Sequence, residues 1–222
     1  MIISWILIHF MEGKTLAILG LTPTAKRISD FVISFFVTSF FCTLGFVLKM
    51  YFGDQDWSMN PDLKLNLVIE GIWWNIKSVL FEELIFRGVL LYILLKRLGG
   101  NKAVVISAIA FGIYHWFSFG IFGSLIPMII VFFITSIMGL LLAYGYVRTL
   151  SLYVPIAIHL GWNLTQNFIF SEGPIGNGIF IKNSAEGFLT NSYFIFAFVT
   201  VIPVAGAILI NYLFIKRKPL KT

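Results

Sequence analysis

The sequence predicts an all-helical bundle that spans a membrane several times. Hydrophobic residues make up 59% of its 222 residues and charged residues only 12%. The mean hydropathy is +0.92, and the apolar residues form runs of about 20, the length that one transmembrane helix needs. Because a typical soluble domain has about 25% charged residues, this composition excludes an ordinary soluble protein.

Six apolar segments are long enough to cross a membrane as helices. They cover residues 31–50, 67–95, 102–119, 124–147, 152–170 and 192–215. Short stretches with glycine, proline or charge separate them, as is typical of turns. No internal repeat or linker divides the sequence, so we expect one domain over residues 1–222 with about six full transmembrane helices. Residues 1–10 are apolar but too few to span. We expect them to lie at the membrane interface or to end an incomplete first helix.

The basic residues predict a cytoplasmic N-terminal loop and a cytoplasmic C-terminus. In this orientation eleven of the sixteen basic residues fall in cytoplasmic segments. They are Lys14, Lys26, Arg27, Lys96, Arg97, Lys102, Arg148, Lys216, Arg217, Lys218 and Lys221. Such an excess follows the positive-inside rule, so the net charge of +6 requires no nucleic-acid partner. The single cysteine, Cys42, excludes an intrachain disulfide and is expected to pack as a small hydrophobe.

Two adjacent carboxylates, Glu82 and Glu83, lie within the second apolar segment. Ionisable side chains at membrane depth are costly and rare, and they generally mark a functional site. Glu83 and Arg87 are four residues apart in the order that favours a helical ion pair, which can support a site or only fix helix packing. Glu82 is turned about 100° away from Glu83 around the helix, and we expect it to act as a general base.

Two further motifs place polar side chains on later helices. In FGIYH, Phe111 and His115 are four residues apart and share one helical face. In HLGWN, His159 and Asn163 have the same spacing, which lets two hydrogen-bond donors point at one oxyanion.

Helix geometry predicts that these polar groups lie at overlapping depths. At 1.5 Å per residue, Glu82 lies ~21 Å from the cytoplasmic end of its segment and His115 ~20 Å along the next. His159 and Asn163 lie ~10 and ~16 Å from the cytoplasmic start of theirs. We therefore expect three helices to contribute to one site.

Together the three motifs resemble those of the CAAX protease and bacteriocin-processing family, also called the type II CAAX prenyl endopeptidase or Abi family. EELIFRG, FGIYH and HLGWN match its EExxxR, FxxxH and HxxxN motifs in order, and the resemblance covers about residues 67–170. It implies a membrane-embedded glutamic protease of a prokaryotic cell membrane, without a metal or other cofactor. Glu82 and His115 would activate water, while His159 and Asn163 would stabilise the tetrahedral oxyanion.

The remaining motif residues, Glu83, Arg87 and Phe111, would support that site. The resemblance implies as substrate a membrane-associated peptide or protein, either of the prenylated CAAX type or a bacteriocin-like peptide. Apart from the membrane lipids, no other partner is implied, and the sequence carries no signal for an oligomeric state or a prenyl pocket.

Two other interpretations fit the same residues. In the first, Glu82, Glu83, His115 and His159 bind zinc in a membrane metalloprotease. These ligand types suit zinc, although the sequence has no HExxH motif. In the second, the protein is a non-catalytic bacteriocin-immunity or scaffold protein that binds a peptide in the membrane.

Overall fold

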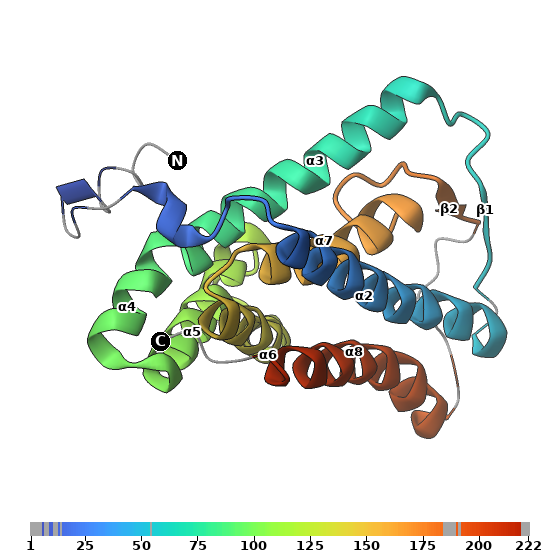
Figure 1. The fold of residues 1–222 in the computed structure, drawn as a ribbon. Coiled ribbons are helices and arrows are strands. Elements are labelled where there is room, and N and C mark those ends of the chain that lie inside the picture. Colours follow the sequence, from blue (N-terminus) through green and yellow to red (C-terminus); the bar gives the residue numbers. More distant parts are fainter. Residues whose placement is uncertain are drawn as a thin grey trace. The chain divides into compact units, whose positions relative to one another are not determined.

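The computed structural model describes residues 15–53, 55–183, 190 and 192–218, and in addition residues 6, 9, 10 and 13. The apolar segment 1–10, which we expected to be interfacial or incomplete, therefore falls largely outside the described residues. The elements follow one another along the chain as drawn in Figure 1. In order they are the 3-10 turn η1 (Leu16–Leu19), α2 (Ala25–Phe52), β1 (Trp57–Met59), α3 (Leu65–Glu83), the π-helical segment η2 (Leu84–Val89), α4 (Leu90–Leu98), α5 (Gly100–Ser118), α6 (Leu125–Thr149), α7 (Tyr153–Leu164), the π-helical segment η3 (Thr165–Ile169), β2 (Phe180–Lys182) and α8 (Tyr193–Lys216).

The prediction of an all-helical membrane protein is confirmed over the described residues, where the only strands are β1 and β2, of three residues each. Helices overlap all six predicted segments. Three of them, α2, α6 and α8, are long and apolar enough to cross a membrane. Helices α4 and α7 have only nine and 12 residues, and α3 and α5 carry the ionisable motif residues. The number of six full spans stays a prediction.

The prediction of one continuous helix over residues 67–95 is wrong. Helix α3 ends at Glu83, η2 follows, and Gly88 has non-helical backbone angles (φ −79°, ψ −127°) before α4 begins. Such π-turns and glycines are common causes of helix kinks, because they interrupt the ladder of backbone hydrogen bonds. At this break the Ser107 hydroxyl of α5 donates to the Phe86 carbonyl at 3.0 Å. The apolar pattern of the sequence does not reveal this break.

The chain forms two compact units. The first consists of Met1–Phe31, Leu80–Ile156 and Tyr212–Thr222. Within it α5 packs closely on α6, and Gly139 of α6 lies at a close contact between the two helices. A Cβ atom there would lie 3.1 Å from the Ala108 Cα and 3.2 Å from the Phe111 ring. A larger residue at position 139 would therefore push α6 away from α5.

The second unit consists of Val32–Val79 and Ala157–Asn211. Its core contains Cys42, Phe46 and Phe170, and the two phenyl rings stack with centroids 4.1 Å apart. Cys42 thus packs as the small apolar residue that the sequence predicts. Strands β1 and β2 pair antiparallel, with Trp57 opposite Lys182. Trp57 of β1 and Phe180 of β2 pack against this core.

Candidate active site

The ion pair between Glu83 and Arg87 anchors the acidic motif in the first unit. Arg87 Nη1 lies 2.9 Å from Glu83 Oε1, and both side chains are fully buried. Arg87 Nη2 donates to the Gly139 carbonyl of α6 at 3.5 Å. The pair that the four-residue spacing predicts is therefore present, and it joins the α3–η2 junction to α6.

Phe111 connects this ion pair to the histidine of the second motif. The Arg87 guanidinium carbon lies 4.0 Å from the centroid of the Phe111 ring, a separation typical of a cation–π contact. The same ring meets the imidazole of His115 edge-on, with centroids 4.4 Å apart. Phe86 packs against Phe111 as well, at 5.2 Å. The position of His115 is thus set by aromatic packing on the buried ion pair.

His115 and Glu82 face each other across a short gap. His115 Nδ1 lies 2.7 Å from the Phe111 carbonyl, and because a carbonyl oxygen only accepts, Nδ1 must carry the proton of this bond. The other ring nitrogen, Nε2, lies 3.9 Å from Glu82 Oε2. This separation is too long for a direct hydrogen bond, but it suits a water molecule that bonds to both atoms. His115 is 7% and Glu82 9% exposed, so the pair is nearly buried.

His159 and Asn163 lie in the second unit, one helical turn apart on α7. His159 is buried and Asn163 is partly exposed. Two residues after Asn163 the α-helix gives way to the π-helical segment η3, just as η2 begins directly after Glu83. π-Helical turns occur frequently at functional sites, and here one lies within the acidic motif and one follows the HLGWN motif.

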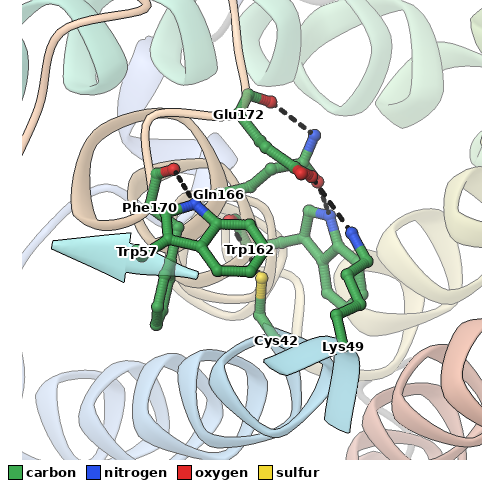
Figure 2. Close-up of polar contacts among 7 residues, drawn as sticks. All are labelled: Cys42, Lys49, Trp57, Trp162, Gln166, Phe170 and Glu172. Atoms are coloured by element: carbon green, nitrogen blue, oxygen red, sulfur yellow. Dashed lines mark hydrogen bonds and ion pairs between the residues drawn. The ribbon is translucent and has the colours of Figure 1, made fainter. Parts of the chain in front are cut away.

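A polar network in the second unit fixes the end of the helix that carries His159 and Asn163 (Figure 2). Trp162 donates to Gln166 at 2.8 Å, and Gln166 donates to the Glu172 carbonyl at 3.3 Å. The Glu172 carboxylate forms a 3.0 Å ion pair with Lys49 of α2. The α7–η3 junction is therefore tied to α2 within this unit.

Several polar contacts around the motifs were not among the predicted site residues. Asn167 of η3 donates to Asn75 of α3 at 3.2 Å, and both side chains are buried. Ser107 and the carbonyl of Gly139 contact the acidic motif, as described above. A polar residue inside an apolar segment, such as Asn75, was the available signal in the sequence, but its partner is 92 positions away.

The structure brings five of the seven predicted site residues together in the first unit: Glu82, Glu83, Arg87, Phe111 and His115. The other two, His159 and Asn163, are in the second unit, and each group is described within its own unit. Among the described residues, no group of three or more His, Cys, Asp and Glu side chains could hold a metal ion.

Comparison with known proteins gives a match to a protein family. Residues 64–165 match the model of a family described as "Rce1-like: Type II CAAX prenyl endopeptidase Rce1-like". The matched range begins just before α3, ends at the first residue of η3 and includes all three motifs. No curated protein matches the chain, and no solved structure does. The match covers less than half of the 222 residues, and over that range the chain is similar to the Rce1-like type II CAAX prenyl endopeptidases, which indicates a protease.

Proposed function

We propose that the protein is an intramembrane endopeptidase in which Glu82 and His115 activate a water molecule. The observation that carries this proposal is the 3.9 Å gap between His115 Nε2 and Glu82 Oε2. The bond from Nδ1 to the Phe111 carbonyl fixes the imidazole so that Nε2 faces the carboxylate. A water bound between a carboxylate and a ring nitrogen is held near a base that can take its proton.

The proposed reaction is direct hydrolysis of a peptide bond. The water oxygen attacks the carbonyl carbon of the substrate while its proton passes to the Glu82 carboxylate. The resulting tetrahedral intermediate carries a negative charge on the former carbonyl oxygen. When it collapses, the C–N bond breaks and the proton passes to the leaving nitrogen. The two products are a carboxylic acid and an amine.

His159 and Asn163 are proposed to donate hydrogen bonds to that oxyanion. The support comes from the HxxxN motif and from the position of both residues on one face of α7, one turn apart. Preorganised donors of this kind stabilise charge where it develops in the transition state. The network at the end of α7 limits the motion of these donors.

Glu83, Arg87 and Phe111 are proposed to position the reacting groups without touching the substrate. Arg87 and Glu83 neutralise each other in a fully buried setting. The Phe111 ring lies between the guanidinium group and the imidazole, so a shift of the ion pair would move His115. No metal takes part in the proposed step, since Glu82 supplies the base and the two donors on α7 supply the oxyanion site.

The proposed substrate is a membrane-associated peptide or protein. The description of the family names prenyl endopeptidases of the CAAX type, so C-terminal peptides that carry a prenylated cysteine are the first class to test. Bacteriocin-like peptides without a prenyl group form the second class. Both would reach the site from the membrane, which suits side chains located within apolar helices.

The test compares two glutamate variants on the same helix. Glu82→Gln keeps the shape of the side chain and removes the base, whereas Glu70→Gln alters an exposed carboxylate of α3. The full chain is reconstituted in vesicles with the two peptide classes, and cleavage is measured by mass spectrometry. Glu82→Gln should lower kcat by about 10²–10⁴, the usual contribution of a general base. Glu70→Gln should leave kcat within a factor of about two.

A second pair of variants separates catalysis from binding. His115→Ala should match Glu82→Gln in severity, and the double variant should be scarcely slower than either one, because groups that act as a unit are not additive. Peptide binding, measured by fluorescence anisotropy, should survive Glu82→Gln. Full turnover by Glu82→Gln would overturn the proposed mechanism. Binding without cleavage by the wild type would favour a peptide-binding membrane protein.

A further inference from the structure

A basic cavity in the first unit, away from the motif residues, has no role in the proposed reaction. Its charged lining residues come from three separate parts of the chain, Lys26, Arg27 and Asp30 from α2, Arg148 from α6 and Lys218 from the segment after α8. The cavity has a volume of about 150 Å³, roughly ten times the space that one water requires.

The cavity has an excess of positive charge. Among the described lining residues, Asp30 is the only carboxylate against four cations, and the ammonium of Lys218 binds this carboxylate. Arg148 is held in place by bonds from Nη2 to the carbonyls of Lys216 and Lys218. Its Nε is buried and has no hydrogen-bond partner among the described residues. At least three positive charges are therefore available to an anion.

The helix that starts at the cavity has an unfavourable charge pattern without such an anion. Lys26 and Arg27 are in the first turn of α2, and that turn has no acidic residue. Cations at a helix N-terminus oppose the helix dipole, which favours negative charge at that end. The first turn of α7, which contributes Tyr153 and Val154 to the lining, has no acidic residue either. An anion in the cavity would offset the positive charge at the start of α2, and it would supply the negative charge that the start of α7 lacks.

The cavity also lies at one end of each of the three helices in the described part of the chain that are long and apolar enough to cross a membrane. These helices are α2, which begins there, and α6 and α8, which end there. At that level a membrane presents the phosphate groups of its lipids. Ile28, the residue after Arg27, is half exposed and offers an apolar surface to an acyl chain. This arrangement favours a phospholipid over a soluble ion as the source of the phosphate.

We propose that this cavity binds the phosphate of an anionic phospholipid. Lys26 and Arg27 contact the phosphate from one side, and Arg148 and Lys218 contact it from the other. Basic pockets between transmembrane helices are suited to such headgroups. The lipid would hold the first turn of α2 against the ends of α6 and α8 within this unit.

The test uses the full chain purified in detergent, with defined lipids added back. Phosphatidylglycerol, phosphatidylcholine and inorganic phosphate are compared by native mass spectrometry and by the shift that each causes in the melting temperature. The double variant Lys26→Gln/Arg27→Gln removes two cavity charges. The matched control Arg97→Gln/Lys102→Gln removes two exposed charges of the same unit outside the cavity.

Phosphatidylglycerol should bind the wild type in preference to phosphatidylcholine and raise its melting temperature. The cavity variant should bind it about 30-fold more weakly, at about one kcal/mol for each basic residue near an anionic lipid. The control should change binding by less than about threefold. If the double variant does not fold, Lys26→Gln alone, at an exposed side chain, should still weaken binding about fivefold.

Equal lipid binding by the cavity variant and the control would overturn the proposal. Preferential binding of inorganic phosphate, with no preference between the two lipids, would instead assign the cavity to a soluble phosphate. Loss of cleavage by Glu82→Gln with lipid binding unchanged would keep this site distinct from the proposed catalytic function.

Discussion

Replacing Arg87 by alanine should destabilise the fold strongly, because the change leaves a charge behind in a buried place. Glu83 and Arg87 are both fully buried and 2.9 Å apart. The guanidinium group also donates to the Gly139 carbonyl and covers the ring of Phe111. Arg87→Ala removes all three contacts and leaves the Glu83 carboxylate in the same surroundings.

The expected cost is about 3–5 kcal/mol in the free energy of unfolding, the usual result of breaking one side of a buried ion pair. Replacing both partners by neutral groups of similar size removes the uncompensated charge. The double variant Glu83→Gln/Arg87→Met should therefore lie within about 2 kcal/mol of the wild type. Arg87→Lys keeps the charge but loses the planar fork, so its cost should be intermediate.

The assay is reversible unfolding in mixed detergent and SDS micelles, followed by tryptophan fluorescence of the six Trp residues. The matched control is Arg97→Ala, at an exposed position of α4, which should change the unfolding free energy by less than about 0.5 kcal/mol. A double-mutant cycle gives the coupling between Glu83 and Arg87. A loss below about 1 kcal/mol for Arg87→Ala, or a double variant as unstable as the single one, would refute this reasoning.

Three further predictions concern catalysis and topology. Thorough chelation should leave peptidase activity intact, because the proposed mechanism needs no metal; activity lost to a chelator and restored by zinc would favour the metalloprotease interpretation. Asn163→Ala should lower kcat by about 10²–10³ with little change in KM, as removal of one oxyanion donor does, and unchanged kinetics would exclude that role. Reporter fusions after Lys102 and Arg148 should report the cytoplasm and a fusion near Asp56 the outside, as the positive-inside rule predicts; the reverse pattern at two of these sites would invert the assigned orientation.

The sequence was sufficient for the features that depend on local chemistry. Apolar composition and segment length placed helices over all six predicted regions, because burial in a membrane requires continuous apolar surface. The four-residue spacing of Glu83 and Arg87 predicted their ion pair, since such positions are neighbours on a helix. The same spacing placed Phe111 and His115 on one face. The motif order was enough to indicate the family whose model matches residues 64–165.

Other features were decided by tertiary structure. The break at Gly88 cannot be seen in the apolar pattern, and the Ser107 hydroxyl that binds the Phe86 carbonyl comes from the next long helix. Likewise, nothing in the acidic motif itself specifies that Arg87 uses the Gly139 carbonyl, 52 residues away.

Tertiary structure also decided how closely His115 Nε2 approaches Glu82. It likewise formed the basic cavity at the ends of α2, α6 and α8. The period of a helix determines which side chains share a face along one segment. The facing partner from a distant segment depends on where helices break and how closely their small residues allow them to pack, and only the folded chain sets those distances.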